Sequence, residues 1–268
     1  MPGEKNLFAG SIPGNYERYL GPFIFEPNAI ELIKHINNTG IKDVLETACG
    51  TGRVTKYLAE FFKGTTNITA SDFSREMIDI AKDSIHDHSI NFVQADMQAL
   101  QFADDSFDLF VCQFGIMFLK DKPTAFKEAH RVLRSGGAFI FNTWDSLENN
   151  PPTAIVNEAV VEYFKGAAPP FFFLPHSMYN TDELEQLMND AGFESITVEP
   201  VTLEITSPSA ENIAKGFVTG TPMYSELVKL DPASPEIIVD IATKMLMKEF
   251  GDDIVRSVSK AFVCKCSK

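Results

Sequence analysis

The sequence has 268 residues, of which 44% are hydrophobic and 22% are charged. This composition excludes a disordered chain and is sufficient for one sizeable core. The formal net charge of −14 disfavours nucleic acid and anionic membranes as partners, because both carry negative charge themselves. Because no secretory leader or membrane-spanning run is visible and the 4 cysteines are scattered, we expect a cytoplasmic protein.

Apolar strands alternate with amphipathic helices along the first half of the chain. The helices repeat apolar residues every three or four positions, and the strands are nearly continuous apolar runs. We predict helices over residues 27–40, 53–64, 74–85 and 123–137. We predict strands over residues 42–48, 66–72, 90–96, 107–114 and 138–144. This alternation predicts an α/β fold, with a parallel sheet covered by helices on both faces.

Side-chain spacing predicts which face of each helix is buried. In the first helix we expect Ile30, Ile33 and Ile36 to face the core. The second helix should bury one stripe, made of Val54, Tyr57, Leu58, Phe61 and Phe62. Ser74 precedes the third helix and is the expected cap of its N-terminus.

The second half of the chain is less regular. Residues 145–180 are rich in proline and phenylalanine and are typical of an insertion, whereas residues 181–193 and 194–206 predict a helix and a long strand. A second irregular stretch leads into a helix over 234–251, with Ser234 as its cap. The last strand, 257–266, places Cys264 and Cys266 on one face, where buried thiols are favoured over a metal pair.

These elements predict one domain over residues 1–268. Its core comprises about 28–144, 181–206 and 257–268; its cap insertions are about 145–180 and 207–256, and residues 1–27 form an N-terminal lid.

The stretch "VLETACGTGRVT", Val44 to Thr55, places two glycines at the end of the first predicted strand. Open α/β sheets bind ligands at the carboxyl ends of their strands, and glycine lets a ligand approach the backbone. A nicotinamide or flavin dinucleotide requires Gly-x-Gly-x-x-Gly, and counting from Gly50 the third glycine falls on Thr55. No Gly-Lys-Ser/Thr follows either, so a P-loop is excluded.

The segment Glu46 to Gly52 resembles the first motif of class I S-adenosylmethionine-dependent methyltransferases, an acid followed by alternating glycines, with Ala48 in place of the first glycine. The resemblance covers about residues 42–144, with weaker similarity over 181–193, and lies closest to the ubiquinone- and menaquinone-type branch and other small-molecule methyltransferases. It implies a three-layer, doubly wound Rossmann-like sheet of seven strands with the last strand antiparallel, helical and loop cap insertions, and S-adenosyl-L-methionine as cofactor.

The resemblance also implies roles for individual residues. Glu46 would accept from loop amides and from the cofactor's ammonium group, Asp72 from the ribose hydroxyls and Asp96 from the adenine amino group, while Met97 would lie against the adenine ring. An acid at a strand end can also be only a helix cap or a loop residue. The remaining expected cofactor contacts are Tyr16, Ala48, Gly50, Thr51, Gly52, Phe73, Met77, Gln113 and Phe114. For Tyr16 and its neighbours, an ordinary amphipathic helix is the alternative.

The resemblance implies methyl transfer by in-line displacement, which needs no covalent nucleophile on the protein and no metal. The Asn/Asp-Pro-Pro-Tyr/Phe motif of amide and adenine methylation is missing from residues 112–117, "CQFGIM". His176 and Tyr179 are weak candidates for a catalytic base, and His130 is expected to be structural. Segments rich in Phe, Met and Tyr, together with Trp144, indicate a small-molecule acceptor with an apolar or aromatic body. Two alternatives remain: a non-catalytic module that binds the cofactor or a partner, and a nicotinamide-dependent oxidoreductase.

Overall fold

The computed structural model describes residues 10–268, except residues 38, 88, 167–169 and 252. The described residues form two compact units. One, which we call the sheet unit, comprises Asn28–Asp145, Pro175–Val201 and Ala261–Lys268. The other, the helical unit, comprises the described parts of residues 1–27, 146–174 and 202–260. The organisation as a single domain stays a prediction.

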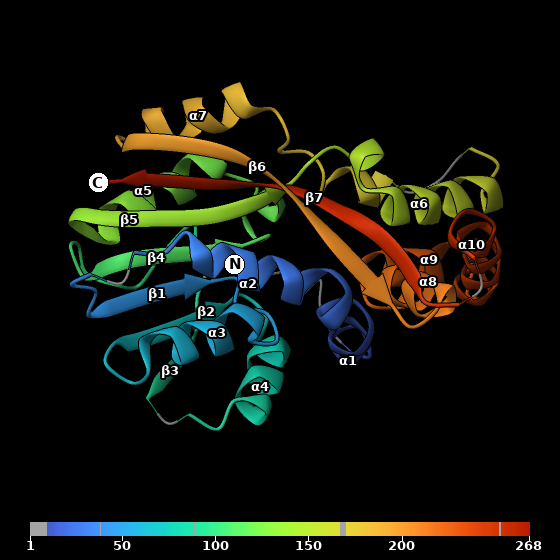
Figure 1. Cartoon of the computed structure of the whole chain (residues 1–268), viewed down its shortest axis with the longest axis horizontal. Coiled ribbons are helices and arrows are strands. Elements are labelled where there is room, and N and C mark those ends of the chain that lie inside the picture. The colour runs from blue at the N-terminus through green and yellow to red at the C-terminus, as the bar shows by residue number, and fades with distance from the viewer. Residues whose placement is uncertain (1–9, 38, 88, 167–169, 252) are drawn as a thin grey trace. The chain divides into compact units, whose positions relative to one another are not determined.

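Seven strands form one sheet in the order β3-β2-β1-β4-β5-β7-β6 (Figure 1). β1 pairs in parallel with β2 and β4, β2 with β3, and β4 with β5, whereas β7 is antiparallel to β5. The strands are β1 Asp43–Thr47, β2 Asn67–Asp72, β3 Ile90–Gln94, β4 Phe107–Gln113, β5 Leu133–Trp144, β6 Glu194–Ser207 and β7 Val255–Ser267. This topology confirms the predicted Rossmann-like sheet of seven strands with its last strand antiparallel.

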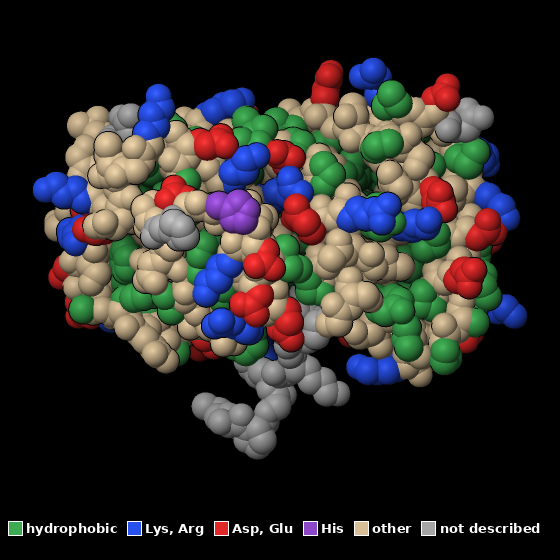
Figure 2. Space-filling view, turned by 90° about the horizontal axis from the view of Figure 1, so that it is seen from below, with side chains coloured by type: hydrophobic (Ala, Val, Ile, Leu, Met, Phe, Trp, Pro, Cys, Tyr) green, Lys and Arg blue, Asp and Glu red, His purple; other side chains and the backbone are tan. Residues whose placement is uncertain are grey.

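The surface carries charges of both signs. On the face shown in Figure 2, Asp and Glu side chains are interspersed with Lys and Arg side chains. Within the described residues, no helix combines the length and the apolar character needed to cross a membrane.

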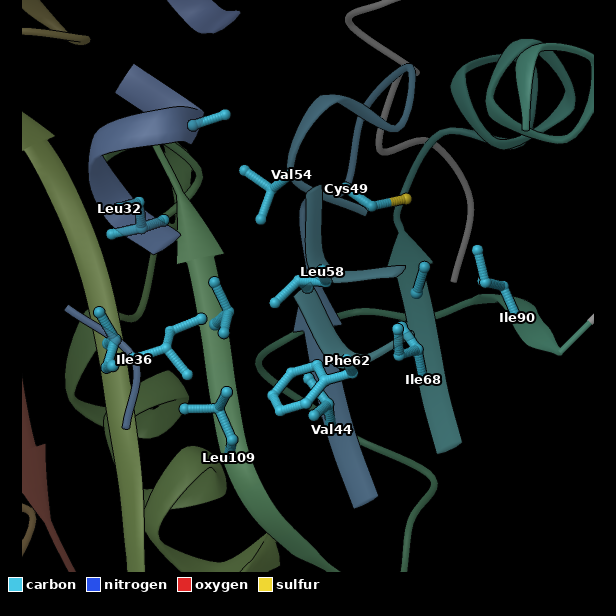
Figure 3. Close-up of a cluster of buried hydrophobic side chains, with 14 of the residues drawn as sticks. Leu32, Ile36, Val44, Cys49, Val54, Leu58, Phe62, Ile68, Ile90 and Leu109 are labelled. Atoms are coloured by element: carbon cyan, nitrogen blue, oxygen red, sulfur yellow. The ribbon is translucent and has the colours of Figure 1, made fainter. Parts of the chain in front are cut away.

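One face of the sheet is covered by α2 (Glu26–Lys34), α3 (Arg53–Phe62) and α4 (Arg75–Ser84). Their apolar side chains and those of the strands form one buried cluster, part of which is drawn in Figure 3. Its members include Leu32, Val44, Leu58, Phe62, Ile68, Ile78, Leu109, Val111 and Ile140. Such a doubly covered sheet is why its strands are apolar throughout.

The opposite face of the sheet packs against α5 (Lys122–Val132) and α7 (Thr181–Asp190), which contact each other. Phe126 of α5 lies against Phe139 and Phe141 of β5, with ring centroids 5.7 and 5.4 Å apart. Cys264 and Cys266 of β7 lie opposite Phe141 and Phe139 and are buried, as predicted. Burial raises the pKa of both thiols.

Side-chain caps begin the helices of the sheet unit. The Ser74 hydroxyl accepts from the Met77 amide at 3.3 Å, which confirms the predicted cap of α4. Asp121 caps α5 by accepting from the Thr124 amide at 3.0 Å, and Asn180 caps α7 by accepting from the Asp182 amide at 3.1 Å. These local bonds satisfy amides that have no partner inside the helix.

The buried face of α2 was predicted wrongly in part. Ile30 is 42% exposed and Ile33 is half-buried, whereas Ala29 and Leu32 are fully buried and Ile36 is buried. The segment carries two overlapping apolar stripes, and packing on the sheet selects the one that contains Leu32. The stripe of α3 is confirmed, with Val54, Leu58 and Phe62 buried and the two other aromatic residues half-buried.

The helical unit contains more helix than the sequence indicated. Its helices are α1 Ile12–Asn15, the π-helix η1 Tyr16–Phe25, α6 Pro151–Tyr163, α8 Ala210–Thr219, α9 Met223–Leu230 and α10 Ser234–Phe250, with short 3-10 turns at Leu147–Asn149 and Pro170–Phe173. The sequence predicts helical and loop cap insertions here but does not locate α6, α8 or α9 individually. The Ser234 cap was also wrong: Ala233 precedes the helix, and the Ser234 hydroxyl donates to the carbonyls of Leu227 and Asp231.

Candidate functional site

A row of polar side chains lies at one end of the sheet face that α2 and α3 cover. Along this face the paired residues Ile68, Val44, Leu109 and Ala138 form one apolar row, and two positions further along each strand the pairing brings Ala70, Glu46, Val111 and Ile140 together. Because side chains alternate between faces, the next residues on the same face are Gln94, Asp72, Gln113 and Asn142. We call these four the polar row. It lies at the carboxyl edge, where such sheets bind ligands.

Glu46 is the one acid within the second row and is only 1% exposed. The Thr55 hydroxyl, in the first turn of α3, donates to its Oε2 atom at 2.7 Å. Burial raises the pKa of Glu46 to about 8, although the Thr55 hydroxyl and amide lower it, and the nearby Asp72 raises it further. At neutral pH this carboxyl is therefore largely protonated.

The loop that follows β1 has an unusual backbone. Ala48, Gly50 and Gly52 have φ values of 53°, 56° and 88°, in the left-handed region. A Cβ on Gly52 would lie 2.7 Å from Ile85 Cδ1 and 3.1 Å from Ala81 Cβ. Gly52 is thus required by its φ and by the close packing of α4, whereas a Cβ on Gly50 would meet no described atom within 4 Å. The main chain at Gly50 is therefore uncovered on the side where a Cβ would lie.

Asp72, and not Glu46, accepts from the glycine loop. Its two carboxylate oxygens accept from the amides of Gly50 and Ser74, each at 2.8 Å. Burial raises the pKa of Asp72, while the amides of Ser74, Gly50 and Phe73 lower it. The expectation that Glu46 receives the loop amides was therefore wrong, because Glu46 lies one row deeper in the sheet and bonds to α3 instead.

Asp96 and Met97 follow β3. The Asp96 carboxylate accepts from the Gln98 amide at 2.8 Å, and the Met97 sulfur accepts from the Thr47 hydroxyl at 3.5 Å. Met97 is buried, as are Thr51 and Met77, whereas Phe73 is 45% exposed. Their contacts with a cofactor stay predictions.

Aromatic side chains gather where β4 and β5 end. Phe114 follows β4 with a φ of 50°, and its ring stacks on Trp144, the last residue of β5, with centroids 3.5 Å apart and planes 6° apart. The Phe114 amide donates to Asn142 twice, to the backbone oxygen at 3.3 Å and to Oδ1 at 3.0 Å. We call Phe114 and Trp144 the aromatic pair. Gln113, in the polar row, immediately precedes it.

His176 is not the surface residue that a loop histidine usually is, because it is only 6% exposed. Its Nδ1 atom lies 2.7 Å from the carbonyl oxygen of Asp145, and its ring centroid lies 6.2 Å from that of Trp144. A carbonyl oxygen only accepts, so Nδ1 carries the proton and the basic lone pair is on Nε2. His130 packs on Phe193, with ring centroids 5.1 Å apart, as a structural histidine would.

Two further candidates lie elsewhere. Tyr179 is 51% exposed and lines an open hollow of about 390 Å³ together with residues that begin α7. Tyr16 begins η1 in the helical unit, where its ring stacks on Phe25 at 4.5 Å. No observation within either unit relates Tyr16 to the polar row, so its role stays a prediction.

Sequence reasoning missed Asn142, Thr55 and Gly115. Asn142 had a visible signal, since it is an amide in the otherwise apolar run "AFIFNTW". Gly115 had none, because its importance depends on a contact: a Cβ there would lie 2.4 Å from Ala48 Cβ.

The residues at this edge fit a cationic nucleoside cofactor. Gly50 leaves main chain accessible, and the acids Glu46, Asp72 and Asp96 end or follow three adjacent strands around it. Carboxylates accept from hydroxyl and amino groups and favour a positive charge nearby. Among described residues, no group of three or more His, Cys, Asp or Glu side chains is placed to hold a metal ion.

Comparisons with known proteins show which families this chain resembles. A family model described as a methyltransferase domain matches residues 45–141. Demethylmenaquinone methyltransferase of Staphylococcus saprophyticus is 28% identical over 211 residues, covering 72% of this chain and 88% of that protein. The same enzyme of Staphylococcus haemolyticus is 29% identical over 211 residues, covering 72% of this chain and 86% of that protein.

Two solved structures share the fold. Phosphoethanolamine N-methyltransferase 2 of Haemonchus contortus, solved with S-adenosyl-L-methionine, has a TM-score of 0.62 at 17% identity and covers 99% of this chain and 58% of its own. The cyclase SpnF has a TM-score of 0.55 at 15% identity and covers 90% of this chain and 81% of its own. The second likeness shows that the fold alone does not determine the reaction.

Proposed function

This chain belongs to the class I S-adenosyl-L-methionine-dependent methyltransferases, and we propose that its methyl acceptor is a small aromatic molecule of the quinone type. The observation that carries the proposal is the aromatic pair, which stands at the end of β4 and β5, beside the loop that follows β1. Both rings are buried, at 5% and 7% exposed, and stacked aromatic side chains at a ligand-binding edge favour a planar ring. The names of the curated relatives, which act on demethylmenaquinone, support the same class of acceptor.

S-adenosyl-L-methionine supplies a methyl group on a positively charged sulfur and leaves as a neutral thioether. The protein's part is to hold the acceptor in line with that methyl group, and such positioning can contribute about 7–11 kcal/mol to lowering the barrier. We propose that Asp72 and the bare main chain at Gly50 hold the nucleoside end of the cofactor. Glu46, Asp96, Met97 and Phe73 complete the proposed cofactor site.

A proton must leave an acceptor whose reacting atom is protonated. His176 is our candidate for the group that takes it, because its Nδ1–H is fixed on the Asp145 carbonyl and its ring lies near Trp144. A base oriented by a hydrogen bond from its other nitrogen is a recurrent arrangement in enzymes. Tyr179, which is 51% exposed and lies just before α7, is the second candidate.

The acceptor class is tested by product analysis. The full chain is incubated with S-adenosyl-L-methionine carrying a deuterated methyl group and with 1,4-naphthoquinol under reducing conditions. We expect a product heavier by one deuterated methyl group in the mass spectrum, and more of it than from indole or phosphoethanolamine. Transfer to phosphoethanolamine but not to the quinol would overturn the proposed acceptor.

Asp72 tests the proposed cofactor site. We expect Asp72→Asn to weaken binding of S-adenosylhomocysteine about tenfold, because the amide cannot accept from Gly50 and Ser74 with both of its atoms while also receiving ribose hydroxyls. Isothermal titration calorimetry measures the affinity. Asp79→Asn, on the exposed side of α4, is the matched control and should bind as the unmodified chain does. Equal affinity of all three proteins would show that Asp72 does not hold the cofactor.

A further inference from the structure

Asn142 joins the polar row to the aromatic pair. It pairs with Gln113 across β4 and β5, and it lies two residues before Trp144 on the same face of β5. Two carboxamides therefore stand side by side just below a stacked pair of rings. Carboxamides next to a buried aromatic pair are suited to a planar ring that carries oxygen atoms.

The orientation of the Asn142 amide is determined by its neighbour. The Phe114 amide donates to Asn142 Oδ1 at 3.0 Å, and an N–H group can donate only to the oxygen of a carboxamide. Nδ2 is consequently the atom that faces away from Phe114. The same bond holds Phe114 in its left-handed conformation, with its ring on Trp144.

Nδ2 is a buried donor that the described residues leave without a hydrogen-bond partner. Asn142 itself is 0% exposed. Proteins satisfy nearly all buried polar atoms, and an unsatisfied donor costs free energy in the folded state. A donor of this kind therefore indicates a hydrogen-bond acceptor that comes from outside the chain.

Thr143, the next residue, provides an internal comparison. Its hydroxyl is also buried and without a partner among the described side chains. Because side chains alternate along β5, Thr143 points to the face that carries Phe139 and Phe141, which pack on α5. Thr143 is therefore as buried as Asn142 but lies on the opposite face of the sheet.

We propose that Asn142 determines specificity for the acceptor: its Nδ2 donates a hydrogen bond to an oxygen atom on the ring of the methyl acceptor, while the ring lies against the aromatic pair. This inference rests on the proposed function. A donor in this place favours oxygenated rings over bare ones, because an analogue without the oxygen leaves the buried donor unsatisfied. It also stabilises negative charge on that oxygen when the ring hydroxyl loses its proton.

The test compares two ring probes on the full chain saturated with S-adenosylhomocysteine. The probes are 1,4-naphthoquinol, kept reduced, and naphthalene, which has the same ring system without oxygen. Equilibrium dialysis gives both affinities, and the fluorescence of Trp144, the only tryptophan of the 268 residues, reports whether the ring binds beside it. We expect the unmodified chain to bind the quinol at least about tenfold more tightly than naphthalene.

Three variants separate the donor from its surroundings. Asn142→Leu should reduce the preference to about twofold or less, while the affinity for naphthalene and for S-adenosylhomocysteine stays within about threefold. Asn142→Met removes the donor but keeps a thioether sulfur that can accept weakly from the Phe114 amide, so it should lose the preference too, even where the leucine variant fails to fold. Thr143→Val should keep the full preference, since its hydroxyl lies on the other face.

An unaltered preference in Asn142→Met, or an equal loss in Thr143→Val, would overturn the inference. So would an unmodified chain that binds S-adenosylhomocysteine but does not distinguish the two probes, and in that case the proposed function still stands. A chain that binds no S-adenosylhomocysteine would refute the proposed function itself, and this inference with it.

Discussion

Glu46 is subject to two opposing effects: its buried position favours the neutral carboxyl, whereas a cationic ligand would favour the ionised one. It lies in an apolar row of the sheet, where a charge is costly, and among the described side chains the Thr55 hydroxyl donates to it. Burial therefore raises its pKa to about 8, so the group is mostly neutral at pH 7 before a cation arrives. A cofactor with a positive sulfur and an ammonium group would favour the ionised form. We therefore expect binding of such a cofactor to release a proton from Glu46.

We expect Glu46→Gln to change the pH dependence of stability. The raised pKa means that the folded state binds this proton more tightly than the unfolded chain, whose carboxyl titrates near 4.5. The contribution of Glu46 is thus complete below pH 4.5 and is lost as pH rises towards 8. Relative to the unmodified chain, Glu46→Gln should gain stability across this window, with a slope of up to about 1.4 kcal/mol per pH unit.

Urea titrations at several pH values measure this difference. Glu226→Gln, an exposed position on α9, is the control and should track the unmodified chain at every pH. A Glu46→Gln difference that does not vary with pH would contradict a raised pKa. Calorimetry of S-adenosylhomocysteine binding in buffers of different ionisation enthalpy should in addition show proton release that the variant lacks.

Two loops depend on each other at the scale of structural elements. The loop after β1 presents Ala48 with a left-handed φ of 53°, and the loop after β4 presents Gly115, whose Cβ position lies 2.4 Å from Ala48 Cβ. The gap between the two loops therefore has room for only one methyl group, that of Ala48. This explains why alanine is accommodated where the methyltransferase motif has its first glycine: Gly115 supplies the room on the opposite side.

We expect Gly115→Ala to destabilise the fold by about 1–3 kcal/mol, because its methyl group would overlap Ala48 and crowd the Cys112 sulfur, 2.9 Å away. Ala48→Gly in the same chain should recover part of that loss by removing the facing methyl group. The two changes should therefore be non-additive, with a coupling of about 0.5–3 kcal/mol in urea unfolding. Strict additivity of the two changes would show that the loops do not share this space.

At the scale of the whole molecule, the acids of the sheet unit behave differently at the two edges of the sheet. At the carboxyl edge, burial raises the pKa of Glu46 and Asp72. At the amino edge, Arg134 bonds Asp43 at 2.9 Å and Asp108 at 2.7 Å. Burial raises the pKa of Asp108, but the Arg134 guanidinium and the amides of Lys42 and Asp43 outweigh it and hold that pKa below its usual range.

Arg134→Met tests the amino edge. A lowered carboxyl pKa stabilises the fold above the ordinary value near 3.8, and that stabilisation is lost as pH falls. Without the guanidinium, acid unfolding should begin at higher pH, by about half a pH unit, in a circular dichroism titration. Lys244→Met, which removes the exposed pair with Asp240, should leave the acid midpoint in place. Equal midpoints for both variants would contradict a role for Arg134 in acid stability.

The sequence by itself determined the sheet elements and most of the edge where we propose that the cofactor binds. The cap Ser74 and the apolar runs of β1, β2 and β4 are local signals, and each is confirmed in the structure. The glycine loop and Asp72 were found for the same reason: the carboxyl ends of parallel strands meet at one edge, so a residue's place in its strand also gives its place in the site.

Only the tertiary structure decided the features that depend on a neighbour far along the chain. Ile30 and Leu32 are equally apolar, and packing on the sheet buried the second. Three such contacts join residues far apart in the sequence. Ala48 packs against Gly115, 67 positions away; the Phe114 amide donates to Asn142, 28 positions away; and the Phe114 ring stacks on Trp144, 30 positions away. Sequence periodicity describes neighbours within a few residues, whereas these contacts exist only once the strands have paired.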